Sequence, residues 1–201
     1  MSYKNIIFDF GGVLVDWNPR YVYREYFNTE PEMENFLGNI CTNEWNLEQD
    51  RGRSMAEGTA ILQRQYPEYH DLISVFYDRW EEMLKSEIHE NVELLYSLRE
   101  RYELFGLTNW SAETISVAHR KYPFLAVFKG IVVSGEEKLV KPDRRIFELI
   151  LERYKLDPVE TVFIDDNIFN VEVAQQLGLT SVHCDSPFGL KEKLIKIKVI
   201  S

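Results

Sequence analysis

The first hydrophobic segment of the chain reads NIIFDFGGVLVDW, from Asn5 to Trp17, and its first apolar run ends at a carboxylate, Asp9. The residues just before Asp9 are apolar without alternation, which is typical of a strand covered on both faces. Gly11 and Gly12 then predict a tight turn directly after the strand. The segment therefore predicts a buried parallel strand that presents Asp9 at its carboxyl end.

Four more short apolar runs have the character of the first one. Amphipathic helical patterns lie between them, and this alternation of strand and helix is the signature of a parallel sheet. We therefore expect an α/β fold with a Rossmann-like parallel sheet. The expected strands are Asn5–Phe8, Leu104–Leu107, Gly130–Val133, Thr161–Ile164 and Ser181–His183, and the expected helices are Asn91–Tyr102, with Asn91 as its cap, Arg145–Tyr154 and Asn170–Leu177.

The segment from about Pro19 to Lys85 differs from the rest of the chain. It is rich in aromatic and acidic residues, its pattern is helical, and it contains no convincing strand. We interpret it as a helical lobe inserted after the first strand. The expected division is a core domain formed by residues 1–18 and 86–201, and a helical cap domain formed by residues 19–85.

Composition excludes several classes of partner. The 201 residues carry a net charge of −10, which argues against nucleic acid or an anionic membrane as the main partner. No apolar stretch reaches the roughly 18 residues that span a bilayer. Two distant cysteines, Cys41 and Cys184, indicate reduced thiols and a cytoplasmic protein. The sequence leaves the oligomeric state open.

Polar residues follow the expected strands at the points where the strands end. In an open α/β sheet, ligands bind outside the carboxyl ends of the strands, so these side chains should converge on one crevice. Lys141, before Pro142 at the start of a helix, should join them. The candidate site residues are Asp9, Thr108, Asn109, Lys141, Asp165 and Asp166.

Such a crevice has the chemistry of a phosphoryl-transfer site. Clustered carboxylates repel one another unless a cation is present, and Mg²⁺ prefers a few oxygen ligands together with water. A carboxylate such as Asp9 can attack phosphorus and form an aspartyl-phosphate. Lys141 and a metal ion would screen the charge, while the Thr108 hydroxyl and nearby backbone N–H groups would hold the phosphoryl oxygens.

Four segments, taken together and in this order, resemble the motifs of the haloacid dehalogenase superfamily, in its phosphatase branch with a helical cap. The segments are Ile6–Val13, Gly106–Asn109, Lys141–Asp143 and Phe163–Asn170. The resemblance covers nearly the whole chain, with the helical lobe in the place of the family's cap. It implies a Mg²⁺-dependent hydrolase that removes phosphate from a small phosphate ester.

The resemblance also implies a role for each matching residue. Asp9 would be the nucleophile, and the catalytic set is Asp9, Thr108 and Lys141. The implied metal ligands are Asp9, the backbone carbonyl of Gly11, Asp166 and, directly or through water, Asp165, with Asn170 in a position that often completes the shell. The implied substrate-binding residues are Gly11, Gly12, Thr108, Asn109 and Lys141.

Gly11 is the one departure from the usual pattern, in which a second Asp serves as general acid and base. Such help is worth roughly 10²–10⁴-fold in rate. A subgroup of sugar-phosphate phosphatases with Asp-x-Gly also resembles this chain, and a sugar 1-phosphate, such as a hexose 1-phosphate, has a leaving group that needs less protonation. Asp16, seven residues after Asp9, is a candidate for the missing acid.

Three other activities use a related site. A metal-independent 2-haloacid dehalogenase also has an Asp nucleophile, but it has no use for the Asp165–Asp166 pair. A weakly active sensor that binds Mg²⁺ and phosphate would not require an aimed nucleophile. A phosphomutase usually needs the second Asp that Gly11 replaces, so the sequence favours hydrolysis.

Overall fold

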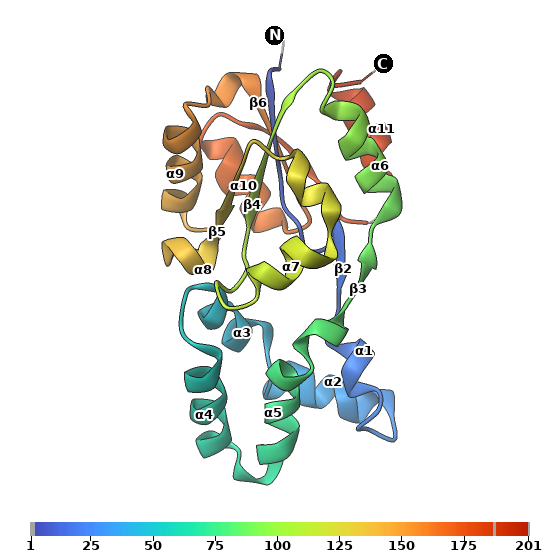
Figure 1. Ribbon diagram of the computed structural model, residues 1–201, viewed down its shortest axis with the longest axis vertical. Helices are drawn as coiled ribbons and strands as arrows, with labels where there is room; N and C mark the ends of the chain where they lie inside the picture. Colours follow the sequence, from blue (N-terminus) through green and yellow to red (C-terminus); the bar gives the residue numbers. More distant parts are fainter. Residues whose placement is uncertain (1–2, 187, 201) are drawn as a thin grey trace.

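The computed structural model describes residues 3–186 and 188–200. Its core is a five-stranded parallel sheet with the strand order β5-β4-β1-β6-β7 (Figure 1). The strands are β1 (Asn5–Phe8), β4 (Glu103–Thr108), β5 (Gly130–Val133), β6 (Thr161–Asp165) and β7 (Thr180–His183). The expected parallel α/β sheet is confirmed, and each expected strand lies within one residue of its observed bounds.

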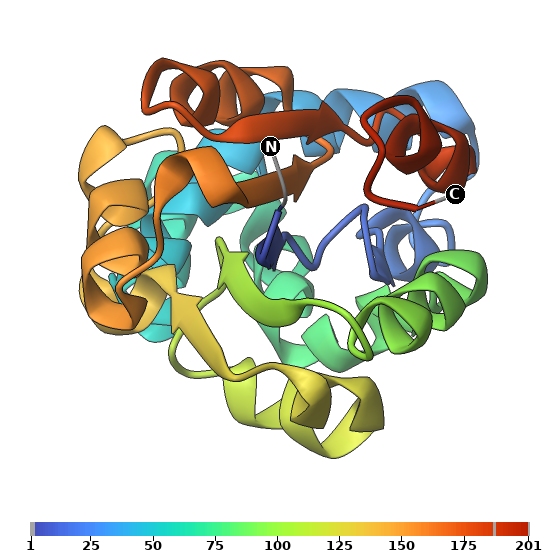
Figure 2. The ribbon, with the colours of Figure 1, turned by 90° about the horizontal axis from the view of Figure 1, so that it is seen from above.

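Helices cover both faces of the sheet because successive strand residues point to opposite sides. In β1, Ile7 packs into one hydrophobic cluster, while Ile6 and Phe8 pack into the other. Figure 2 shows the two layers of helices on either side of the strands. The first layer holds α9 (Arg144–Tyr154) and α10 (Ile168–Gln176), and the second holds α6 (His89–Leu98), α7 (Ile115–Lys121) and α11 (Leu190–Lys196).

The expected helices are present, but two of them start two residues earlier than expected, and α6 ends at Leu98 rather than at Tyr102. Asn91 does not cap α6, which begins at His89; its side-chain amide is buried and donates to the carbonyl of Val13 at 2.7 Å. Helix α10 begins at Ile168, capped by Asn167, rather than at Asn170. Asn91 has a tertiary hydrogen bond that the local sequence pattern does not reveal, and Asn170 donates instead to Asp165, five residues before it. Short elements complete the core: α8 (Ser134–Glu137) and the 3₁₀ helices η3 (Pro123–Val127) and η4 (Pro158–Glu160).

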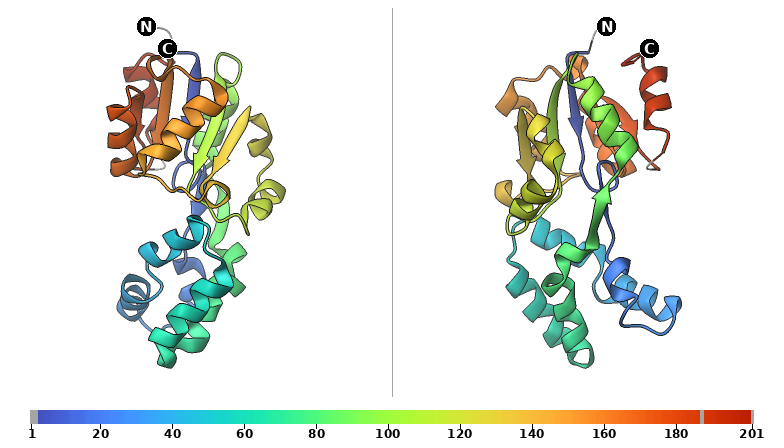
Figure 3. Two further views of the ribbon diagram at one scale, coloured as in Figure 1. Left: turned by 90° about the vertical axis from the view of Figure 1, so that its left-hand side faces the viewer. Right: turned by 45° about the vertical axis from the view of Figure 1, so that its right-hand side comes forward.

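The inserted lobe lies beyond the carboxyl ends of the strands and is helical, as expected (Figures 1 and 3). Three of its helices start at a hydroxyl cap, Thr29, Thr42 or Ser54, whose oxygen accepts a backbone N–H three residues ahead. The lobe contains α1 (Arg20–Tyr23), α2 (Glu30–Asn39), α3 (Asn43–Asp50), α4 (Met55–Gln65), η1 (Pro67–Tyr69), α5 (His70–Asp78) and η2 (Trp80–Met83).

Two short antiparallel strands that the sequence did not reveal connect the lobe to the core. They are β2 (Val15–Trp17) and β3 (Leu84–Glu87), which pair with an irregular register (Figure 3, right). Both are too short for a recognisable hydrophobic pattern. The division into a core of residues 1–18 and 86–201 and a cap of residues 19–85 cuts this two-stranded connection, and we retain it as our proposed division.

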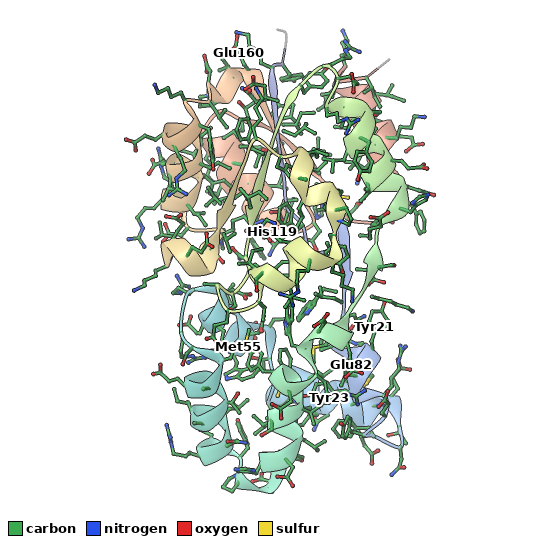
Figure 4. The ribbon with its side chains drawn as sticks, in the orientation of Figure 1. Tyr21, Tyr23, Met55, Glu82, His119 and Glu160 are labelled. Atoms are coloured by element: carbon green, nitrogen blue, oxygen red, sulfur yellow. The ribbon has the colours of Figure 1, made fainter. Side chains whose placement is uncertain are left out.

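Aromatic side chains fill the interior of the lobe. Tyr23, labelled in Figure 4, is fully buried and packs against Phe36 and Phe76, and its hydroxyl donates to the carbonyl of Leu72 at 2.9 Å. The longest helices, α4 and α9, have 11 residues each. Within the described ranges, no helix combines the length and the apolar character needed to cross a membrane.

Candidate active site

The sheet register brings Asp9 and Asp165 to the same level. Phe8 of β1 pairs with Ile164 of β6, so the residues that follow them are neighbours. The backbone N–H of Asp9 donates to the carbonyl of Ile164 at 2.9 Å and prolongs this pairing. Two carboxylates from distant parts of the chain therefore lie at the carboxyl ends of neighbouring strands. These strand ends face the cap (Figure 1).

Lys141 forms ion pairs with both carboxylates. Its ammonium group lies 2.9 Å from Asp9 Oδ1 and 2.7 Å from Asp165 Oδ2, and donates to the carbonyl of Leu107 at 2.8 Å. The side chain is only 2% exposed. Burial opposes the charge on Lys141, but the adjacent carboxylates of Asp165 and Asp9 raise its pKa above the usual value. The lysine is thus a fixed positive charge beside Asp9.

Asn109 holds the backbone that carries Lys141. Its side-chain amide donates to the carbonyl of Lys141 at 3.0 Å and accepts the N–H of the same residue at 2.9 Å. This two-way bond locks the Lys141 segment onto the end of β4. Asn109 therefore has a positioning contact in addition to the substrate contact that the sequence suggests.

Asp165 uses both carboxylate oxygens inside the protein. Oδ2 faces Lys141, while Oδ1 accepts the backbone N–H of Asn167 at 2.8 Å and the amide of Asn170 at 2.9 Å. Asp165 is completely buried. Asn170, which the sequence suggested as part of a metal shell, contacts Asp165 and orients it.

A cation fits the cluster formed by Asp9, Asp165 and Asp166. One carboxylate oxygen of each lies within 4.8 Å of the others. Burial raises the pKa of Asp9 well above its usual value, and the Asp165 and Asp166 carboxylates raise it further, although Lys141 opposes them. Three carboxylates outweigh one ammonium, and oxygen-only donors of this kind suit a hard ion such as Mg²⁺.

Gly12 allows Asp166 to approach the loop after β1. Its φ is +71°, and a Cβ on this residue would lie 2.2 Å from Asp166 Oδ2. Any side chain at position 12 would displace the carboxylate. The second glycine of the motif therefore does more than turn the chain, because it makes room for a candidate metal ligand.

Thr108 has an unused hydroxyl at the end of β4. The side chain is buried, and its Oγ1 has no hydrogen-bond partner among the described residues. Buried polar atoms are nearly always paired, so an orphaned one calls for an explanation. A phosphoryl oxygen beside Asp9 would supply the missing partner.

A small cavity of about 100 Å³ lies between the cap and the strand ends. Gly11 contributes to the core side of this cavity. Of its other residues, the sequence pointed to Asn109 as a site residue. The cap residues Asn46, Asp50 and Trp80 were missed, because only the fold brings the cap over Gly11. The cavity is lined by Gly11, Trp17, Trp110, Trp80, Asn46, Asp50 and Asn109.

A larger and more open cavity, of about 740 Å³, lies on the other side of the glycine pair. Gly12, Asp166 and Asp16 line it, together with residues after β7. The phenol of Tyr21 donates to the Asp16 carboxylate, at 3.0 Å from Oδ1 and 2.8 Å from Oδ2. Tyr21, labelled in Figure 4, stands where the cap joins the core.

Comparisons with known proteins identify the family of the chain and several relatives. A family model described as haloacid dehalogenase-like hydrolase matches residues 3–178. A sesquiterpene phosphatase of Aspergillus oryzae is 25% identical over 192 residues, which are 90% of each chain. The structure of a haloacid dehalogenase family enzyme from Bacteroides thetaiotaomicron, in complex with magnesium and inorganic phosphate, is 26% identical with a TM-score of 0.68 and covers 90% of this chain and 94% of that one. A hydrolase of the same fold from Porphyromonas gingivalis is 23% identical, with a TM-score of 0.74 over the whole of both chains.

Proposed function

Because the chain belongs to the haloacid dehalogenase-like hydrolase family, we propose that it is a Mg²⁺-dependent phosphatase. It removes phosphate from a small phosphate ester through an aspartyl-phosphate on Asp9. The observation that carries the proposal is the Asp9 carboxylate, fixed beside Lys141 at the end of β1, 2.9 Å from its ammonium group. The relative that is a phosphatase and the relative with bound magnesium and phosphate support it.

The residues of this chain divide the work of phosphoryl transfer. The backbone N–H of Phe10 and the ammonium of Lys141 both contact Asp9 Oδ1, which fixes the plane of the nucleophilic carboxylate. Lys141 neutralises charge as the carboxylate meets the anionic phosphoryl group. The free hydroxyl of Thr108 donates to a phosphoryl oxygen, and no other partner in the described chain competes for it.

The metal site of the proposal consists of Asp9, Asp166 and the backbone carbonyl of Gly11, with Asp165 in support. When bound, Mg²⁺ supplies positive charge that polarises the phosphoryl group and balances the clustered carboxylates. Because Asp165 is already bonded to Lys141, Asn167 and Asn170, it acts mainly by holding Lys141 in place.

The small cavity favours a compact leaving group. Its volume of about 100 Å³ is below the roughly 300–1,000 Å³ of pockets for drug-sized ligands. Its walls combine tryptophan rings with the amides of Asn46 and Asn109, a mixture that suits the apolar face and the hydroxyl edge of a sugar ring. We therefore place a sugar phosphate, such as a hexose 1-phosphate, first among the substrates to test.

A terpenyl phosphate is the second candidate. The sesquiterpene phosphatase of Aspergillus oryzae aligns with 90% of this chain, and the three tryptophans of the cavity would suit a hydrocarbon. The volume of about 100 Å³ argues against a terpenyl chain of this size in the cavity that Gly11 lines.

The test is phosphate release from a panel of sugar phosphates, terpenyl phosphates and p-nitrophenyl phosphate, with Mg²⁺ and with EDTA. We expect Mg²⁺-dependent turnover in the wild type and in the surface control Asp71→Asn, and none in Asp9→Asn. A protein that binds Mg²⁺ but releases phosphate from no ester would refute the proposal and favour the sensor function. Turnover that survives Asp9→Asn would exclude the aspartyl-phosphate.

A further inference from the structure

The structure leaves an open space where a second acid would stand in this kind of site. Gly11 lacks a side chain, and a Cβ built on it has no atom within 4 Å. The space belongs to the small cavity between cap and core, which Gly11 lines. Any group that transfers protons to the leaving oxygen must therefore reach this cavity from elsewhere in the chain.

Asp50 is the carboxyl residue that lines the same cavity, from the cap side. It is the last residue of α3, and its Oδ2 accepts a hydrogen bond from Asn46 at 3.2 Å. Building on the proposed phosphatase function, we propose that Asp50 is the general acid and base of the reaction. The cap thus supplies the catalytic group that the core motif lacks at Gly11.

The backbone of Asp50 is fastened to the core. The hydroxyl of Ser134 donates to the carbonyl of Asp50 at 2.6 Å and accepts the backbone N–H of Trp110 at 2.9 Å. Figure 1 shows the result, with α3 directly beyond α8 at the strand ends. Two residues after Asp50 the chain turns at Gly52, whose φ is +104° and where a Cβ would lie 3.1 Å from the carbonyl of Gly135. A catalytic group needs such a fixed position.

The surroundings of Asp50 suit a proton carrier at neutral pH. Burial raises the pKa of its carboxyl to about 7, against a backbone hydrogen bond from Ser111 that lowers it. The Asp50 carboxylate in turn contributes to raising the pKa of the Tyr77 phenol on α5, which burial raises most. General acids and bases work best when their pKa lies near the working pH.

Asp16 is less well placed for the same role. Its carboxylate accepts the hydroxyl proton of Tyr21 between its two oxygens and lines the larger cavity with Gly12. It does not line the cavity that contains Gly11. The local sequence after Asp9 pointed to Asp16, whereas the folded chain brings Asp50 to the open position.

The proposed proton transfers balance over the two half-reactions. As Asp9 attacks phosphorus, the bond to the leaving oxygen breaks, and that oxygen takes the proton of the Asp50 carboxylic acid and departs as an alcohol. Water then attacks the phosphorus of the aspartyl-phosphate and gives one proton to the Asp50 carboxylate. The bond between phosphorus and the Asp9 oxygen breaks, which releases hydrogen phosphate and restores both carboxyl groups.

Rapid mixing of Asp50→Asn with p-nitrophenyl phosphate and Mg²⁺ tests the proposal. p-Nitrophenolate leaves without protonation, so the first half-reaction survives and releases a burst of one p-nitrophenol per enzyme. Hydrolysis of the phosphoenzyme loses its base, so steady turnover falls by about 10²-fold or more, and the intact mass gains one phosphoryl group. Glu48→Gln, an exposed carboxylate on the same helix, is the control and should match the wild type.

Two further variants make the result decisive. Aspartate introduced at the open position, in Gly11→Asp with Asp50→Asn, should recover phosphoenzyme hydrolysis at least about 10-fold over Asp50→Asn. Wild-type kinetics in Asp50→Asn, no recovery in the double variant, or a loss seen in Asp16→Asn instead would each overturn the assignment. A wild type that releases phosphate from no ester of the panel would overturn the phosphatase function itself, which distinguishes the two failures.

Discussion

Replacing Asp50 by asparagine should make the folded protein more stable above pH 7, although it removes the carboxyl group proposed for proton transfer. The physical reason is that the carboxyl lies in a partly buried site next to tryptophan rings, where its charged form is poorly solvated. Asparagine has nearly the same shape, keeps the contact with Asn46 and carries no charge. The variant therefore lacks the poorly solvated charge that destabilises the folded wild type at high pH.

The sign and size of the effect follow from the pKa of Asp50. Burial raises it from 3.8 to about 7, so the folded protein keeps a proton that the unfolded chain has lost. In the wild type, the contribution of Asp50 to the free energy of unfolding falls as pH rises from about 4 to about 7, and it is constant above that. At about 1.4 kcal/mol per pH unit, the difference between the two pKa values corresponds to a loss of at most about 4 kcal/mol of unfolding free energy. Solvent screening of a partly buried group reduces this loss to about 1–2 kcal/mol.

Urea unfolding of both proteins at about pH 5 and about pH 8 measures the difference. We expect the advantage of Asp50→Asn to grow with pH, and to raise the melting temperature at about pH 8 by roughly 2–4 °C per kcal/mol. The exposed control Glu48→Gln should show no such trend. A variant that is less stable than the wild type at about pH 8, or a difference that does not change with pH, would refute the reasoning.

Three other substitutions test the site. Gly12→Ala places a Cβ 2.2 Å from Asp166 Oδ2, so the Mg²⁺ concentration for half-maximal activity should rise at least about 10-fold, whereas Gly11→Ala, with free space around its Cβ, should change it little. Lys141→Met leaves the buried Asp165 without its cation and should cost about 3–5 kcal/mol of unfolding free energy, measured by urea titration; a loss below about 1 kcal/mol would contradict the buried ion pair. Thr108→Val removes a hydroxyl without a partner in the described chain, so the unfolding free energy should hold within about 1 kcal/mol while kcat/KM for p-nitrophenyl phosphate falls about 10-fold or more; equal kcat/KM would exclude the phosphoryl contact.

The core of the fold was predictable because its strands are buried on both faces. Continuous apolar runs such as Asn5–Phe8 and Thr161–Ile164 contain all the information needed to recognise a covered parallel strand. The strands β2 and β3 could not be recognised, because three or four residues carry no periodic signal. Asn91 was misjudged as a helix cap, since its bond to the carbonyl of Val13 joins residues 78 positions apart.

In the candidate site, too, the positions set by strands were predictable, whereas individual side-chain bonds were not. The meeting of Asp9, Lys141 and Asp165 was predictable. Asp9 and Asp165 end recognisable strands, Lys141 precedes the helix that follows another strand, and the carboxyl ends of parallel strands lie on one side of the sheet. The particular bonds of Asn109 and Asn170 were not predictable, since an amide at a strand end suits a ligand and a neighbouring side chain equally well. Only the geometry shows that they hold Lys141 and Asp165.

Asp50 marks the limit of inference from local sequence. It stands among many carboxylates in an acidic helical lobe, and nothing in its neighbours sets it apart. Its environment is created by the cap meeting the core, where Ser134 fixes its backbone and three tryptophans line the same cavity as its side chain. A proton carrier placed on the cap is poised only while cap and core are in contact. This arrangement would couple proton transfer to an assembled cavity, so the loss of an acid at Gly11 need not mean the loss of general acid catalysis.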